Sequence, residues 1–157
     1  MGPTMTLLLG LSAIASAALC AVLARMRGEP GTPLLALMCA AVSVWCVGNA
    51  VQINTTDVEV KRQTVTLAFA CITVAVYSFW RAVIMRAPWP WRVPNVVSYI
   101  WAAPGIVTVA LAAATDANGP FFSTLPISAD REPVFAQPGP WMFVHLLWAY
   151  TLMIWAM

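Results

Sequence analysis

The chain has 157 residues, of which 61% are hydrophobic and 9% are charged, and its formal net charge is +2 at pH 7. Soluble domains carry about 25% charged residues, so this composition excludes a soluble catalytic domain and a nucleic-acid-binding domain. We predict a polytopic membrane protein whose chemistry takes place between helices or at the membrane surfaces.

Five apolar stretches predict five membrane-spanning helices. Each holds about 17 to 22 residues, and about 20 apolar residues cross the hydrocarbon core of a bilayer. In chain order, the predicted spans cover residues 5–24, 34–53, 64–85, 95–115 and 141–157. The residues before the first stretch carry no basic side chain, which argues against a secretory signal peptide. The expected fold is an all-α transmembrane helix bundle with a single domain, residues 1–157.

The connections between the spans hold most of the polar residues. The longest connection, residues 116–140, is rich in proline and is expected to form an outer loop without a long helix or a central strand. Within it, Phe121 and Phe122 are expected to dip into the membrane interface. The third span is preceded by charged residues that we expect in a solvated loop: Asp57, Glu59, Lys61 and Arg62.

Orientation follows from the distribution of cations, because cytoplasmic connections of membrane proteins are enriched in Lys and Arg. One side of the predicted bundle holds Arg25, Arg27, Arg81, Arg86 and Arg92, and the other holds Lys61, Arg62 and Arg131. This predicts an extracytoplasmic N-terminus and a cytoplasmic C-terminus. In the third connection, anchors at headgroup level are predicted at Arg86, Trp89, Trp91 and Arg92.

Small and polar residues inside the spans predict helix packing. Ser12 and Ser16 form a small-xxx-small pair that lets another backbone approach closely. Asn49 and Gln52, near the outer end of the second span, are expected to face other helices. Interhelical hydrogen bonds are also expected, with the lining of a small ligand cavity as the alternative, for Thr73, Ser78, Ser98 and Thr108.

The fifth span contains the single histidine of the chain. Helical spacing places on one face the residues Trp141, His145, Trp148, Leu152 and Trp155. Lipid tails do not reward such an aromatic stripe, so we predict that it contacts another protein chain, a further helix, or a bound lipid or pigment. The alternative is an aromatic seam against a neighbouring helix, with His145 hydrogen-bonded across it.

No cofactor, metal site or catalytic constellation is predicted. One histidine cannot supply both ligands of a bis-histidine haem, and axial ligation of a single metal by His145 is the alternative. Arg81 is the one charged residue inside the predicted spans, whereas pumps and transporters of charged substrates need intramembrane acids or bases. The sequence contains no nucleophile–base pair and no phosphate-binding loop. The chain is therefore not predicted to be an enzyme.

Four segments carry recurring sequence patterns: residues 45–51 (WCVGNAV), 77–81 (YSFWR), 114–122 (ATDANGPFF) and 138–145 (PGPWMFVH). In order and spacing they resemble the seven-helix N-terminal sensory region of bacterial histidine kinases. The resemblance implies a multi-pass protein of the bacterial cytoplasmic membrane with its N-terminus outside. In that family a cytoplasmic signalling module follows seven spans, whereas this sequence stops in its fifth predicted span. The histidine of a Thr-Asn-Pro-His-like turn in the family is also missing from residues 114–122.

Three hypotheses for the function follow. The first is a non-enzymatic accessory or structural subunit of a larger membrane complex, because its aromatic and small-residue faces need partners. Those partners would be other integral membrane subunits and membrane lipids. The alternative is the membrane sensory input region of a bacterial histidine kinase that lacks its catalytic module. A second alternative is a cofactor-binding electron-transfer subunit that uses His145.

Overall fold

The computed structural model describes residues 2–26, 28–87, 93–114, 120–124 and 137–157. The elements in these ranges are α1 (Gly2–Arg25), α2 (Thr32–Asn54), α3 (Val58–Arg86), α4 (Asn95–Ala114), β1 (Phe122–Thr124), β2 (Gln137–Pro138) and α5 (Pro140–Trp155). The prediction of an all-α helix bundle is confirmed.

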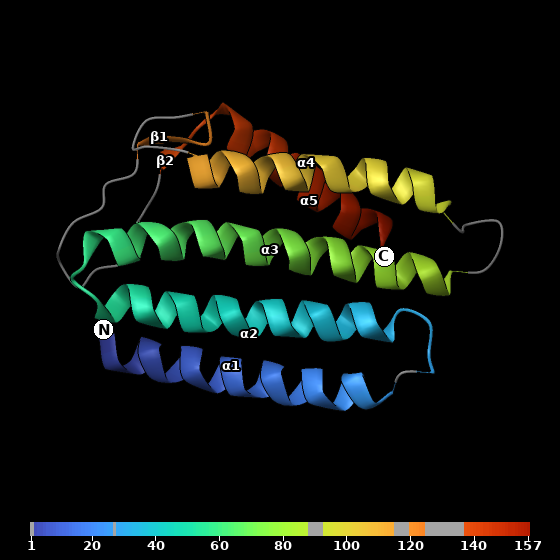
Figure 1. Ribbon diagram of the computed structural model, residues 1–157, viewed down its shortest axis with the longest axis horizontal. Coiled ribbons are helices and arrows are strands. Elements are labelled where there is room, and N and C mark those ends of the chain that lie inside the picture. The colour runs from blue at the N-terminus through green and yellow to red at the C-terminus, as the bar shows by residue number, and fades with distance from the viewer. Residues whose placement is uncertain (1, 27, 88–92, 115–119, 125–136) are drawn as a thin grey trace.

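The helices lie side by side and successive helices run in alternating directions (Figure 1). α1 packs on α2 and α2 packs on α3, while α4 and α5 pack on α3 and on each other. Figure 1 shows α1 and α2 on one side of α3, and α4 and α5 on the other. α3 is therefore the central helix of the bundle.

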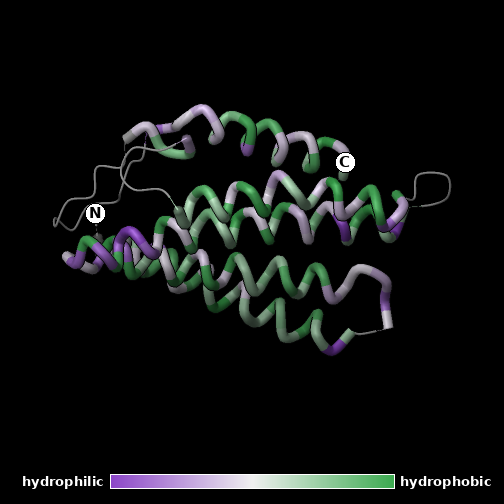
Figure 2. The backbone as a smooth tube through the Cα atoms, turned by 45° about the horizontal axis from the view of Figure 1, so that its top comes forward, coloured by the Kyte–Doolittle hydropathy of each residue, from purple (hydrophilic) through white to green (hydrophobic). Residues whose placement is uncertain are grey.

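Four helices, α1 to α4, are long and apolar enough to cross a membrane. Hydrophobic residues run along their length, and hydrophilic residues gather toward the ends of the bundle (Figure 2). α5 has 16 residues, which is below the roughly 20 that a spanning helix needs. A multi-pass helical membrane protein is thus supported, while the fifth span and the orientation stay predictions.

The expectation of a solvated loop before the third span was wrong. α3 begins at Val58, and the carboxylate of Asp57 caps it by accepting hydrogen bonds from the backbone N–H of Glu59 (2.9 Å) and Val60 (3.2 Å). Such a cap satisfies N–H groups that the first turn cannot satisfy itself. Arg62 pairs with Glu59 on the surface of this turn (2.8 Å), but Lys61 is fully buried.

The connection between α1 and α2 is fitted closely against the end of α3. Gly31 adopts a left-handed conformation (φ 78°), and a Cβ at this position would lie 2.7 Å from the carbonyl oxygen of Ala82. The guanidinium of Arg86 donates to the carbonyl oxygen of Pro30 (2.8 Å) and to the hydroxyl of Thr32 (3.0 Å). Arg86 is one of the predicted headgroup anchors. It links the C-terminal end of α3 to the start of α2.

The other three predicted anchors, Trp89, Trp91 and Arg92, lie outside the described residues.

The expectation that two phenylalanines of the outer loop enter the membrane interface was also wrong. Phe121 and Phe122 are 0% and 1% exposed, and they pack with Val65 of α3 and Ala112 of α4. The ring of Phe69 meets both edge-on, with ring centroids 4.7 and 5.4 Å away. These contacts hold the short β1–β2 ribbon against the end of the bundle.

The small and polar residues expected to pack the helices behave differently from one another. In α1, Ser12 is exposed and Ser16 is half-buried, while the neighbouring Ala13 is buried and accepts a hydrogen bond from Ser43 (3.0 Å). In α2, Gln52 is buried among the helices. Asn49 is half-buried and donates to the carbonyl of Trp45 in its own helix (3.0 Å).

Candidate functional site

The histidine-bearing face of α5 is buried within the chain. His145 is 3% exposed, Trp148 is 5% exposed and Leu152 is 0% exposed, whereas Leu147 and Tyr150 on other faces are 71% and 65% exposed. The buried face packs against α3 and α4. The prediction that this stripe seeks a surface outside these five helices is therefore corrected, because α3 and α4 already supply the contact.

Two indole N–H groups of this face bond to α4. Trp148 donates to the carbonyl of Trp101 (2.8 Å), and Trp141 donates to the hydroxyl of Thr108 (3.1 Å), which itself donates to the carbonyl of Pro104 (2.8 Å). Proline has no N–H to donate to the preceding turn, and its ring presses on that turn. The two tryptophans thus bond to α4 on either side of the interruption that Pro104 causes.

Trp155 lies at the edge of the same face. It is 40% exposed, yet its ring lies 5.6 Å from the rings of both Trp80 and Trp101, measured between centroids. Trp80 is fully buried, and its indole N–H has no hydrogen-bond partner among the described residues. Aromatic packing therefore holds the end of α5 against α3 and α4.

His145 is enclosed by aromatic rings. The centroid of its imidazole lies 5.5 Å from that of Trp148, 6.2 Å from that of Phe69 and 6.3 Å from that of Phe121. A macrocycle bound to His145 would have to displace one of these rings. Its Nδ1 has no hydrogen-bond partner among the described residues, so the bond expected across the seam is not made through that atom.

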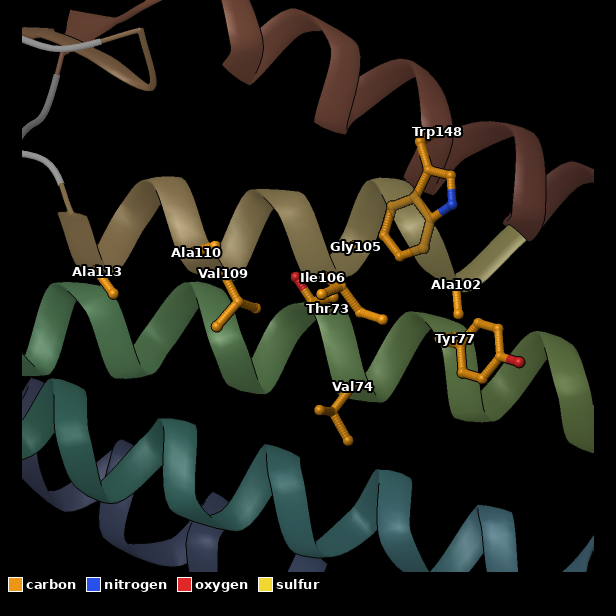
Figure 3. Close-up of a pocket in the computed structure, with 10 residues that line it drawn as sticks. All are labelled: Thr73, Val74, Tyr77, Ala102, Gly105, Ile106, Val109, Ala110, Ala113 and Trp148. Carbon is orange, nitrogen blue, oxygen red and sulfur yellow. The ribbon is translucent and has the colours of Figure 1, made fainter. Parts of the chain in front are cut away.

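An apolar groove of about 440 Å³ runs between α3 and α4, and Trp148 of α5 closes one part of it (Figure 3). Its α4 wall is formed by Ala102, Gly105, Ile106, Val109, Ala110 and Ala113, and its α3 wall by Thr73, Val74 and Tyr77. Binding pockets for small molecules typically measure about 300 to 1,000 Å³. The groove is thus large enough for a ligand.

Gly105 sets how closely three helices approach beside this groove. A Cβ at this position would lie 2.7 Å from the Cγ2 methyl of Thr73 and 3.0 Å from the indole ring of Trp148. Any side chain larger than hydrogen would therefore force the side chain of Thr73 or Trp148 to shift. Gly105 was not among the residues that the sequence singled out.

The four polar residues expected to bond between helices differ in what they contact. The hydroxyl of Thr108 accepts a bond from α5, and the carbonyl of Ser98 accepts one from the Tyr77 hydroxyl of α3 (3.1 Å). Thr73 is 7% exposed, lines the groove, and its hydroxyl has no hydrogen-bond partner among the described residues. For Thr73 the arrangement matches the alternative of a ligand cavity. Ser78 is buried, at 1% exposed.

The described residues contain no group of three or more His, Cys, Asp or Glu side chains that would hold a metal ion. Two other features of the described residues are candidates for a functional site. One is a buried histidine in an aromatic cage, and the other is an apolar groove with one unsatisfied hydroxyl.

Comparison with known proteins agrees with the resemblance seen in the sequence. The family model described as the N-terminal 7TM region of histidine kinase matches residues 8–157. The match includes every described helix from α2 to α5 and most of α1. No curated protein and no solved structure matches the chain.

Proposed function

Because this chain belongs to the family of N-terminal seven-transmembrane regions of histidine kinases, we propose that it is the membrane sensory input of a bacterial histidine kinase. The single observation that carries the proposal is the family match over residues 8–157. In this role the chain catalyses no reaction itself. It converts an event within the membrane into a change in helix packing that a kinase module detects.

The hypothesis of an accessory subunit loses its main physical support. It rested on an aromatic face of α5 that needed an external partner, and that face packs on α3 and α4. Electron transfer through His145 is also less favoured, because the rings of Phe69, Phe121 and Trp148 enclose the imidazole. Neither hypothesis has an observation that favours it over a sensory role.

The packing supports a route for the signal. The groove and the close approach at Gly105 lie where α3, α4 and α5 meet, and the Trp148 bond joins α5 to α4 beside them. A ligand shifts an equilibrium between two packings only if it binds one of them better than the other. Occupancy of a groove between α3 and α4 would act directly on Trp148, and so on the position of α5.

The test is phosphorylation of the native complex. We would place an epitope tag at the chromosomal N-terminus, solubilise membranes in mild detergent, precipitate the tagged protein and add radiolabelled ATP. We expect acid-labile, base-stable phosphate, which is the signature of phosphohistidine, in the tagged sample and none in an untagged strain. A tagged protein that co-migrates with a large complex and incorporates no such phosphate would restore the accessory-subunit hypothesis.

A further inference from the structure

We propose that acid weakens the packing of α5 on α3 and α4, and that His145 is the group responsible. The neutral imidazole permits the packing, and the protonated imidazolium opposes it. The signal would be a rise in proton concentration at the end of the bundle that carries the β1–β2 ribbon. The inference names a signal for the proposed sensory function and rests on that function only for this meaning. It does not involve the groove.

The first argument is the surroundings of the imidazole. His145 is 3% exposed, and its ring centroid lies 5.5, 6.2 and 6.3 Å from those of Trp148, Phe69 and Phe121. Its Nδ1 has no hydrogen-bond partner among the described residues. Both ring nitrogens of a protonated histidine are N–H donors. Protonation would therefore place a positive charge and an unbonded N–H among aromatic rings.

The second argument is the absence of a counterion on the face of α3 that α5 covers, as far as the residues are described. Glu59 pairs with Arg62 at the surface, and Asp57 caps the first turn. Lys61 is fully buried and shares a helix face with Phe69, eight residues or roughly 12 Å further along. Because Lys61 is a cation, it offers the imidazolium no attraction.

The other elements that pack on α5 are α4, β1 and β2. Their described residues include no charged side chain, and α5 itself has none. The remaining charged residues of α3, Arg81 and Arg86, are cations near its far end. Tyrosine and cysteine side chains are uncharged at neutral pH, so no counterion comes from the other titratable groups of these helices: Cys71, Tyr77, Tyr99 and Tyr150.

The sign of the effect follows from this comparison. An aromatic face attracts a cation, but this attraction is smaller than the cost of burying a charge without a counterion. The packed arrangement therefore holds the imidazole neutral. An exposed imidazole takes up a proton near pH 6.5. Protons thus bind the loosened arrangement better than the packed one and favour it as the pH falls. The stability that the packing provides is present above about pH 6.5 and is lost below it.

The third argument is the position of His145 along α5. The residue lies five positions after Pro140, where α5 begins, which is roughly 8 Å along the helix axis. Figure 1 shows the start of α5 beside the β1–β2 ribbon, at the end of the bundle where α3 also begins. Loosening about two turns of α5 is therefore enough to expose the imidazole at that end. A proton needs no path through the interior of the bundle.

The experiment is unfolding of the full-length protein by SDS in mixed micelles at pH 7.5, 6.5 and 5.5. Relative to His145→Phe, the unfolding equilibrium constant of the native protein should rise about tenfold from pH 7.5 to 5.5. This is the change expected for a group that takes up a proton near pH 6.5 only after unfolding. His145→Gln, a second variant that cannot titrate, should match His145→Phe. Tyr150→Phe, on an exposed face of α5, should keep the native pH dependence.

A second measurement reports the protonation state directly. The chain has one histidine, so selective ¹⁵N-histidine labelling, with a purification tag that contains no histidine, yields the signals of this imidazole alone. In nanodiscs at pH 5.5, we expect the chemical shifts of a neutral ring. Neither measurement contains ATP, so acid sensitivity can fail while phosphohistidine is found, or succeed while it is not.

Three outcomes would overturn the proposal. The same pH dependence in the native protein and in both His145 variants would show that the imidazole does not couple packing to acid. Native stability that rises in acid relative to the variants would show that the imidazolium has a counterion. A folded-state imidazole that takes up a proton near pH 6.5 would show that the aromatic rings accommodate the charge.

Discussion

At the scale of single residues, the packing of this bundle depends on where side chains are absent as much as on where they are large. Gly105 lies where α3 and α5 approach α4, and an added Cβ would come within 2.7 Å of Thr73 and 3.0 Å of Trp148. Gly10 in α1 has no such neighbour, since nothing lies within 4 Å of an added Cβ. The same residue type thus has a steric role in one helix and none in another.

Replacing each of these glycines with alanine should separate the two situations. Gly105→Ala should lower the free energy of unfolding by about 1–3 kcal/mol, the usual cost of overpacking a core. Gly10→Ala should leave it unchanged or raise it by up to about 1 kcal/mol, because glycine disfavours helices. Unfolding by SDS in mixed micelles measures both. Equal stability of the two variants would contradict the close approach at Gly105.

Trp148 should behave as a core residue. Its side chain is 5% exposed and its indole donates to the carbonyl of Trp101, so Trp148→Ala should cost about 3–5 kcal/mol of unfolding free energy. Leu147→Ala, at the adjacent exposed position, should cost little. The same SDS titration compares them. A stable Trp148→Ala protein that only loses a partner would favour the accessory-subunit hypothesis after all.

At the scale of elements, α5 is tied to the bundle at its first residues. The N–H of Gly139 donates to the carbonyl of Phe121, and that of Trp141 donates to the carbonyl of Pro120, both at 2.9 Å. A Cβ at Gly139 would lie 2.5 Å from the Pro120 oxygen. The backbone at Gly139 has an ordinary negative φ, so the requirement for glycine there comes from space and not from backbone conformation.

Gly139→Ala should therefore loosen the start of α5. The added methyl must displace the Pro120–Phe121 backbone, which would weaken the two hydrogen bonds that hold α5. Hydrogen–deuterium exchange of peptides from residues 137–147 should become faster, while exchange in α1 and α2 stays unchanged. Gly28→Ala, where an added Cβ meets nothing within 4 Å, is the control. Native-like exchange in Gly139→Ala would show that the ribbon does not position α5.

At the scale of the whole molecule, the helices sort the cations into two groups. Arg25 and Arg86 lie at one end of the bundle, and Lys61 and Arg62 lie near the other, because α1 and α3 run in the same direction while α2 runs opposite to both. This agrees with the grouping on which the orientation was predicted. The grouping does not depend on which end faces the cytoplasm.

The orientation itself is a prediction about reporter fusions. The end with more cations should be cytoplasmic, so fusions after Arg27 and Pro90 should show cytoplasmic reporter activity. Fusions after Asp57 and Ala129 should show extracytoplasmic activity. Paired reporters, one active on each side, provide the control for expression. Reversed signals at all four sites would invert the orientation, and they would remove its agreement with the topology that the family resemblance implies.

How much of the structure was predictable differs from helix to helix. The spans expected at 34–53 and 95–115 match α2 and α4 within two residues at each end. The ends of these helices coincide with the ends of long apolar stretches, which can be recognised in the sequence. The start of α3 was missed by six residues, since Asp57, Glu59 and Lys61 suggested a solvated loop. The cap by Asp57 was the available signal, as aspartate is a preferred residue at that position.

The sequence alone determined the membrane location, the helical class, the family and the shared face of Trp141, His145 and Trp148. These properties depend on composition and on spacing within one helix, which the order of residues contains directly. Only the tertiary structure decided what covers that face, that Lys61 is buried, and that Thr73 lies beside a groove. Those outcomes depend on distances between helices far apart in the chain, and periodicity within a helix does not specify its neighbours.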